Sequence, residues 1–505
     1  MASATVGGAD ASEPRQTSEI LLSSSGITGL DKAICAYLLA PVALFCLWLQ
    51  PAALAVVLGL ASVGAWWALG ARKANESGIS PRWWIVIVSI SLFWTALAGA
   101  GHLFYANLDW LIRDAVLHDL STAEWPATYH PESRQPLLLR APIAYYLPAA
   151  SIGQWLGVGA ANWALYAWTA AGVALVLAGA CSLFATPKER VGCIVLLMFF
   201  GGLDLLGYVW GERHLPQLGE HIEWWMLYIQ YSSNSTLLFW VPNHALPAWL
   251  GTILVLRHWG KPEFATLVPL VSTAIPLWSP LAAIGLFPLF AFAIAWRRDF
   301  RLLLSLRSSL PFLPLALFVA LYLSADASSV PHGWMIDTAQ SIPAFAFRYV
   351  LFCLLEFGLL ALFLARAGVA TSPFRVSILV LLALPFYYYG GGNDLAMRAS
   401  IPALMVLALA AVTPLFQTPK IPGRAMLLGV LALGMLGAAQ EPIRALLHPA
   451  WKPMPNSIPQ AVTMWDSSIE DRYPAHYFAQ PDQSPIGWLL RDSTPIEVAD
   501  KVTGR

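Results

Sequence analysis

The chain has 505 residues, of which 58% are hydrophobic and 11% are charged, and its mean hydropathy is +0.61. A water-soluble fold of this size would not tolerate so many apolar runs of near-spanning length, so the composition indicates an integral membrane protein. The 29 basic and 29 acidic residues cancel to a formal net charge of zero, which argues against a nucleic-acid partner.

The first 31 residues are polar and rich in Ser, Ala and Gly. They lack a basic start followed by a short apolar core, so no cleavable signal peptide is predicted. The five cysteines all fall inside apolar runs and show no metal-ligand spacing. We interpret them as small core residues rather than disulfides. No cofactor is predicted, and a divalent metal is left open.

Apolar segments recur along the chain and predict an all-α polytopic membrane domain over residues 33–440, with about thirteen transmembrane helices and outer interfacial helices. Residues 143–158 are also apolar, but a crossing there would turn every later basic loop outward, so we expect them not to cross. The pair 264–277 and 279–296 is short and punctuated by prolines, which favours a hairpin beside a cavity. The expected crossings are 33–49, 52–70, 83–104, 161–185, 191–210, 244–258, 264–277, 279–296, 310–324, 345–366, 374–389, 401–416 and 425–440.

The orientation is predicted from the basic residues. One alternate set of loops carries most of them, including Lys188, Arg257 and Arg375, whereas the other set carries few. Because Lys and Arg accumulate on the cytoplasmic side, we expect segment 1–32 inside and tail 441–505 outside, in the manner of a bacterial inner-membrane protein. The predicted outer loops are 105–160, 211–243, 325–344 and 390–400.

The first outer loop concentrates carboxylates between Asn107 and Glu132. Asp109 directly follows an apolar run and stands beside Trp110, a residue typical of membrane interfaces. A carboxylate held at that boundary can act as a general base, so Asp109 and Asp114 are the candidate catalytic residues. The alternative is that these acids form a solvated helical face or pair locally.

The spacing of this loop predicts particular pairs. Asp109 and Arg113 stand at i,i+4, as do Asp114 and His118, and such residues are neighbours on a helix. The remaining acids of the loop are interpreted as a solvated face; these are Asp119, Glu124 and Glu132.

The second outer loop combines aromatic residues with acids and histidines. Aromatic faces that stack on sugar rings, with Glu220, His221 and Glu223 as hydrogen-bonding partners, would suit a hydroxyl-rich ligand, and Asn243 and His244 follow nearby. The alternative is an amphipathic helix that lies in the membrane interface.

A triple glycine at 390–392 precedes Asn393, Asp394 and Arg398. Glycines let a backbone approach a ligand closely, and a guanidinium suits phosphate, so this turn is a candidate phosphate cradle. The alternative is a simple loop with an Asp394–Arg398 pair at i,i+4.

Asp204 and Glu356 lie within or at the ends of spanning segments. Ionisable residues at such depth are costly and are often functional. No series of acids along one helix forms a proton relay, which weakens the interpretation as a pump.

With Asp109 in NLDW at the membrane edge, the interfacial stretch APIAYYLPAASIGQWLG and acids in a second outer loop, the chain resembles the GT-C class of integral-membrane glycosyltransferases. The resemblance implies inverting transfer of a sugar from a polyprenyl-phosphate carrier to a glycan, lipid or protein acceptor. It implies Asp109 as the base, with Arg398 or Arg140 stabilising the leaving phosphate.

Other classes of function stay open. A polysaccharide polymerase or ligase would depend more on outer arginines and histidines than on Asp109. A transporter of lipid-linked oligosaccharides should show inverted repeats, and none is evident. A non-catalytic membrane subunit predicts that no single outer carboxylate is essential.

Overall fold

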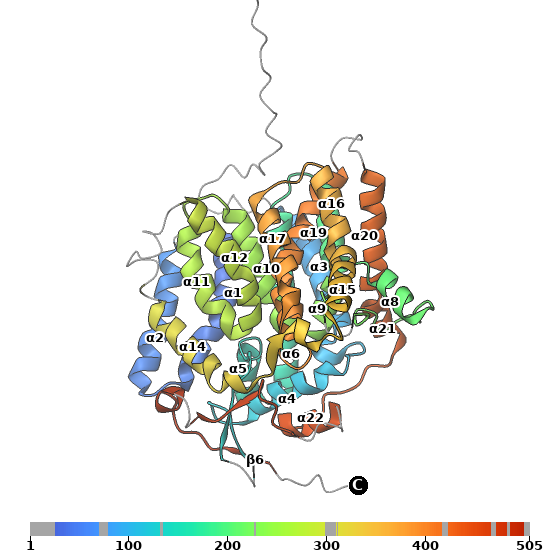
Figure 1. Cartoon of the computed structure of the whole chain (residues 1–505). Helices are drawn as coiled ribbons and strands as arrows, with labels where there is room; N and C mark the ends of the chain where they lie inside the picture. The colour runs from blue at the N-terminus through green and yellow to red at the C-terminus, as the bar shows by residue number, and fades with distance from the viewer. Residues whose placement is uncertain are drawn as a thin grey trace, which may run out of the picture.

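The computed structural model describes residues 26–69, 79–131, 135–226, 229–297, 310, 312–416, 423–465, 471–481 and 485–498. Its helices form a bundle, and a small sheet lies with α4 (Asp109–Thr122) and α22 (Ile458–Trp465) at the lower end in Figure 1. The five cysteines are buried and free. A helical membrane architecture, as predicted, therefore describes most of the chain.

The other helices follow in chain order. They are α1 (Gly29–Phe45), α2 (Ala52–Ala68), α3 (Pro81–Leu97), α5 (Leu147–Leu156), α6 (Val158–Cys181), α7 (Pro187–Phe199), α8 (Asp204–Glu212), α9 (Asn234–Trp240), α10 (Pro242–His258), α11 (Phe264–Trp278), α12 (Pro280–Arg297), α14 (Leu313–Ser324), α15 (Ile342–Cys353), α16 (Leu359–Arg366), α17 (Ser372–Ala383), α18 (Asp394–Ala399), α19 (Ile401–Phe416), α20 (Arg424–Ala438) and α21 (Gln440–Leu447).

Within the described ranges, six helical stretches are long and apolar enough to cross a membrane. Shorter apolar helices of 10–17 residues account for most of the other predicted crossings, so the total of about thirteen remains a prediction. The six stretches are Gly29–Trp48, Val158–Cys181, Pro187–Glu212, Ile342–Arg366, Asp394–Phe416 and Arg424–Leu447.

Local sequence explains where several helices begin and end. The Thr186 hydroxyl accepts from the backbone N–H of Glu189, and the Glu189 carboxylate accepts from the backbone N–H of Thr186. This capping box starts α7. Gly157 has a φ of 85°, which separates α5 from α6. Pro242 opens α10 directly after the end of α9, in the first-turn position where its missing N–H costs nothing.

The segment expected not to cross contains α5, which has 10 residues. A helix of that length rises about 15 Å, half of a hydrocarbon core of about 30 Å. The following helix, α6, has 24 residues and rises about 36 Å, which is enough to cross.

The length of α6 allows the predicted topology to be tested at the two ends of this helix. Asn162 lies near the start of α6, and Lys188 lies just beyond its other end. We expect a single cysteine at position 162 to be labelled from outside the cell and one at position 188 only from inside. Labelling of both positions from the same side would contradict the predicted orientation.

The prediction of an all-α chain is incomplete, because the described residues also form two small sheets. The larger has the order β5–β2–β1–β6, with β1 parallel to β6 and antiparallel to β2, and β2 antiparallel to β5. The smaller pairs β3 and β4 antiparallel. The strands are β1 (Thr128–Pro131), β2 (Leu137–Leu139), β3 (His332–Trp334), β4 (Tyr387–Tyr389), β5 (Phe478–Ala479) and β6 (Ile496–Val498).

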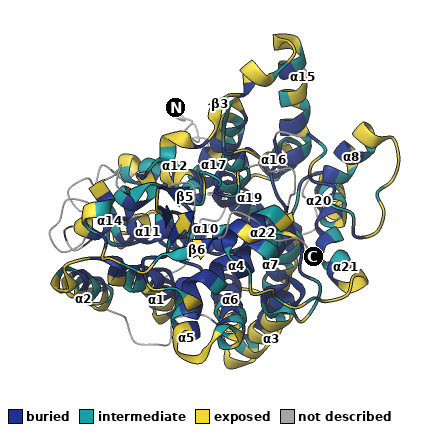
Figure 2. Ribbon diagram, turned by 90° about the horizontal axis from the view of Figure 1, so that it is seen from below, coloured by how far each residue is buried: buried dark blue, intermediate teal, exposed yellow. Residues whose placement is uncertain are grey.

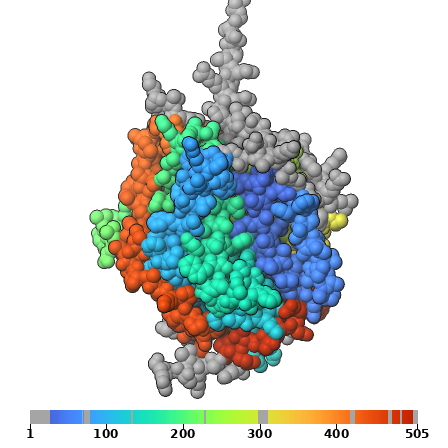
Figure 3. Space-filling model, turned by 180° about the vertical axis from the view of Figure 1, so that it is seen from behind, coloured from blue at the N-terminus to red at the C-terminus, as the bar shows by residue number. Residues whose placement is uncertain are grey.

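The C-terminal tail therefore folds onto the first loop. It supplies β5, β6 and α22, and α22 packs on α4. We call α4, α22 and the four strands β1, β2, β5 and β6 the cap layer. In Figure 3 the tail residues, in red, lie across the lower end of the molecule. Strands of two to four residues carry too little alternation to be recognised from sequence.

Asp119 connects the first loop to the C-terminal tail within the cap layer, so its assignment to a solvated face was wrong. It is 1% exposed and accepts hydrogen bonds from the Tyr129 hydroxyl (2.7 Å) and the Ile458 backbone N–H (2.9 Å). Glu124 is exposed as predicted, and it accepts from the Thr494 backbone at 3.0 Å. Glu132 lies outside the described residues.

We expect Asp119→Ala to destabilise the cap layer. The substitution leaves the Tyr129 hydroxyl and the Ile458 N–H buried without an acceptor, and each such group costs about 1–3 kcal/mol. Limited proteolysis of the tail should speed up accordingly. Glu124→Ala, on the exposed face of the same loop, should change the rate little, and an equal effect of both variants would contradict the buried role.

Candidate functional site

Polar side chains from separate parts of the chain meet where α4 begins. Seen from below in Figure 2, α4 and α10 lie near the middle of this end and are largely buried. Six of these residues were named from the sequence, whereas Tyr146 and Tyr477 were not anticipated. We call this set the Asp109 cluster: Asp109, Arg113, Tyr146, Asn243, His244, Asp394, Arg398 and Tyr477.

Arg113 holds the centre of the cluster. Its Nη1 donates to Asn243 Oδ1 at 2.9 Å and to the Tyr146 hydroxyl at 3.3 Å. Its Nη2 lies 3.2 Å from Asp109 Oδ2, which confirms the predicted i,i+4 pair. The Arg113 side chain is 8% exposed and that of Asp109 is 25% exposed. A buried arginine thus orients a carboxylate that still reaches solvent.

The turn before α4 sets the position of Asp109. Asn107 accepts from the Asp109 backbone N–H at 3.1 Å and donates to the Phe239 carbonyl at 2.9 Å. Trp110 Nε1 donates to the same carbonyl at 3.0 Å. Trp110 is therefore a buried anchor between α4 and α9, not the interfacial residue that the sequence predicted.

Asn243 and His244 enter the cluster from the first turn of α10. His244 Nδ1 lies 2.7 Å from Ser279 Oγ, and Ser279 forms the turn between α11 and α12. The predicted hairpin is therefore present, and its tip contacts His244. Arg398 and Arg113 both lie within electrostatic range of the His244 imidazole.

The glycine turn brings in Asp394 and Arg398. Gly390 has a φ of 90°, and a Cβ there would meet Asp394 Oδ2, so only glycine fits. Asp394 Oδ1 and Arg398 Nη2 are 3.4 Å apart, which is the i,i+4 pair expected from the alternative interpretation of this turn as a simple loop. Asn393 caps the helix through the Ala396 N–H at 3.4 Å. The helix has only six residues, so its cationic side chain, rather than its N-terminus, is the feature suited to an anion.

Arg398 is largely buried and only partly paired. Its side chain is 12% exposed, and its Nε has no hydrogen-bond partner in the described part of the chain. Asp109, Arg113 and Tyr477 lie within electrostatic range of its guanidinium. A buried guanidinium with an unused donor is poised to bind an incoming anionic group.

The tail adds Tyr477, which no feature of the sequence singled out. The Arg140 backbone N–H donates to the Tyr477 carbonyl at 2.7 Å, and the Arg140 guanidinium donates to the Ala475 carbonyl. Arg140 is thus a clamp for the tail rather than a free cation in the site. Burial raises the pKa of Tyr477, and the nearby Arg113 opposes that rise. The tyrosine therefore stays protonated and can donate a hydrogen bond.

Asp114 faces away from this arrangement. It pairs with His102 at 2.9 Å, whereas His118 pairs with Asp119 at 3.1 Å, so the predicted Asp114–His118 pair was wrong. The backbone at Gly101 and His102 has positive φ and carries the imidazole over α4. Burial raises the pKa of Asp114, and the hydrogen bond from His102 opposes the rise.

The three candidate residues of the second outer loop contact other side chains and are not part of the Asp109 cluster. Glu220 accepts from the Tyr208 hydroxyl at 2.6 Å, and this hydrogen bond lowers the pKa of the Glu220 carboxyl. His221 Nδ1 lies 2.8 Å from Glu441 on α21. Glu223 is buried and accepts from the Thr236 hydroxyl at 2.6 Å, at the start of α9. In the described structure these contacts hold the loop and α21 together.

The intramembrane acids Asp204 and Glu356 are both buried. Trp225 Nε1 donates to Glu356 at 2.9 Å, and Glu356 lies in a π-helical turn at Leu354–Gly358. These contacts place the pair against the second loop.

Among the described residues, no group of three or more His, Cys, Asp or Glu side chains is arranged to hold a metal ion. Comparison of the chain with family models, curated proteins and solved structures finds no match.

Proposed function

We propose that the chain is a membrane glycosyltransferase with the Asp109 cluster as its active site. It would move a sugar from a polyprenyl-phosphate carrier to a glycan, lipid or protein acceptor at the outer face of a bacterial plasma membrane. The observation that carries the proposal is the pairing of a partly exposed carboxylate, Asp109, with a second, largely buried guanidinium, Arg398, that has an unused donor.

The two groups suit the two ends of such a reaction. Asp109 accepts the proton of an acceptor hydroxyl, whose oxygen forms a new bond to the anomeric carbon of the donor sugar. The bond from that carbon to the carrier's phosphate breaks, and the phosphate leaves with the electron pair. Arg398 stabilises the charge that develops on the phosphate. Attack opposite the leaving group inverts the anomeric centre.

The remaining members of the cluster would position these two groups and the sugar. Asn243 and Tyr146 hold Arg113, which in turn orients Asp109. His244 and Tyr477 present hydrogen-bonding atoms near the cations and suit sugar hydroxyls or phosphate oxygens. These roles are positional, since neither residue forms a hydrogen bond with Asp109 in the described part of the structure.

A polysaccharide polymerase or ligase is the second candidate, and one observation favours it. Arg113, Arg398 and His244 lie within electrostatic range of one another, so the cluster is rich in the cationic and imidazole groups that such an enzyme would use. In that case the basicity of Asp109 would matter less than these groups.

The test compares lipid extracts and envelope glycans of a strain that carries the protein with those of a deletion strain. The transferase predicts that a polyprenyl-phosphate monosaccharide accumulates and that a glycan lacks one residue. A polymerase or ligase predicts that lipid-linked oligosaccharides accumulate instead. Unchanged lipids and glycans would overturn both proposals.

A further inference from the structure

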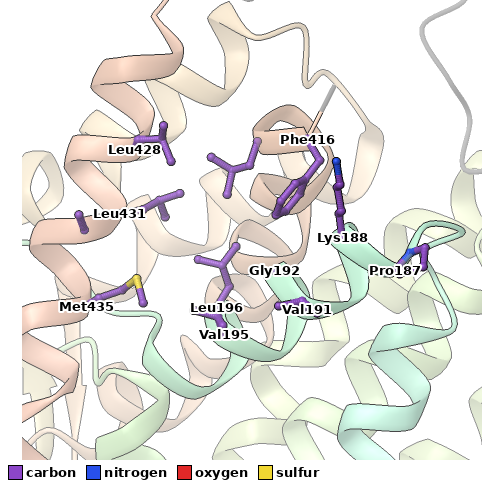
Figure 4. Close-up of a pocket in the computed structure, with 12 residues that line it drawn as sticks. Pro187, Lys188, Val191, Gly192, Val195, Leu196, Phe416, Leu428, Leu431 and Met435 are labelled. Atoms are coloured by element: carbon purple, nitrogen blue, oxygen red, sulfur yellow. The ribbon is translucent and has the colours of Figure 1, made fainter. Parts of the chain in front are cut away.

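An apolar groove of about 550 Å³ runs along the surface beside α7 (Figure 4). Val191 and Val195 of α7 form one wall, and Leu428 and Met435 of α20 form the other. Phe416, the last residue of α19, lies near one end, close to Lys188. Among the described residues that line the groove, Lys188 is the one that carries a charge.

The groove lies at membrane depth, because α7 and α20 belong to stretches that can cross a bilayer. Its lining runs along α7 from Pro187 to Leu196, a rise of about 14 Å. That is about half of a hydrocarbon core of about 30 Å, so the groove has the depth of one leaflet. Its apolar walls offer water no hydrogen bonds, and an empty groove would forgo dispersion contacts. Hydrocarbon is therefore the material that fills it.

The charge of Lys188, at the mouth of the groove, indicates which kind of lipid headgroup binds there. Lys188 is exposed, and no ion pair within the described ranges involves it. Arg257, near the same end of the bundle, is instead buried against Asp31 at 2.6 Å. A second groove of about 440 Å³ lies on the other side of α7, shares Val191 and Val195, and has Arg82 in its lining. Both apolar grooves thus include one cation suited to an anionic headgroup.

The position of the groove separates its occupant from the glycosyl donor. Arg398 lies just before α19, a helix of 16 residues that ends at Phe416 and rises about 24 Å. The mouth of the groove and the Asp109 cluster are therefore at opposite ends of the bundle. We propose that the groove binds an acyl chain of an anionic phospholipid from the leaflet at the Lys188 end, with the lysine ammonium paired to the phosphate. This inference does not depend on the proposed function.

Binding can be measured by native mass spectrometry of the delipidated full chain, titrated with phosphatidylglycerol or with phosphatidylcholine of the same acyl chains. We expect the wild type to favour phosphatidylglycerol. Lys188→Gln should weaken phosphatidylglycerol binding about fivefold and leave phosphatidylcholine binding unchanged, since one surface cation contributes about that factor. Ala432→Trp, which places an indole in the groove, should weaken both lipids.

Two matched controls lie outside the groove. Arg375→Gln removes an exposed cation from the start of α17, and Leu436→Trp adds an indole to another exposed position on α20. Both should bind as the wild type does. Equal wild-type affinity for the two lipids, or unchanged binding in Lys188→Gln, would overturn the proposal. Because Lys188 is exposed, that variant remains decisive even if Ala432→Trp fails to fold.

Discussion

Asp109→Asn is expected to abolish sugar transfer while the protein remains folded. An asparagine keeps the volume of aspartate, and its amide oxygen can still accept from Arg113, which lies 3.2 Å from the native carboxylate. The amide cannot take the acceptor's proton, however, and a general base typically contributes 10²–10⁴-fold to the rate. The measurement is transfer from a synthetic polyprenyl-phosphate sugar by the purified protein, alongside its thermal unfolding.

Other acidic residues serve as comparisons for this variant. Glu124→Gln changes an exposed carboxylate of the same loop and should transfer normally. If Asp109→Asn turns over normally while Asp114→Asn or Glu223→Gln is inactive, the base lies elsewhere. If Asp109→Asn stays active and His244→Gln does not, the polymerase or ligase becomes the better proposal. Activity in all of these variants would overturn the glycosyltransferase.

Arg398→Ala is expected to impair use of the donor by about 10²–10³-fold, the usual effect of removing one preorganised donor to a developing anion. Arg398→Lys should recover only part of this loss. A lysine restores the charge and can still pair with Asp394, but it lacks the planar fork that binds phosphate through two parallel hydrogen bonds. The measurement is the dependence of the initial rate on donor concentration.

A distant arginine tests whether the effect is local. Arg375 is exposed at the start of α17, and Arg375→Ala should leave donor use unchanged. Normal kinetics in Arg398→Ala would mean that the glycine turn and Asp394–Arg398 serve only the structure of α18. A loss in Arg398→Lys equal to that in Arg398→Ala would point to a strict need for the bidentate geometry.

Parts of the site could be predicted because they depend on near neighbours in the sequence. Asp109–Arg113 and Asp394–Arg398 are i,i+4 pairs, and helical geometry alone brings such residues together. The tip of the α11–α12 hairpin followed from its prolines and its short helices. Long apolar runs marked the membrane helices for the same reason, since the bilayer imposes a length on each segment separately.

Other features were decided only when distant segments met. Asn243 reaches Arg113 across 130 positions, and Tyr477 comes from a tail that no periodic pattern tied to the site. Asp119 looked like a solvated acid, because its burial depends on α22, which lies more than 300 residues away.

The carboxylates of the first loop show most clearly which features depend on near neighbours in the sequence and which depend on distant segments. The order of residues alone indicates that acids gather where an apolar run ends, and that some have a basic neighbour one helical turn away. The packing of the helices brings Asp114 to His102, makes Asp119 hold the tail and leaves one edge of Asp109 exposed. Helical periodicity places residues within one element, whereas burial and charge pairing depend on which elements pack against each other.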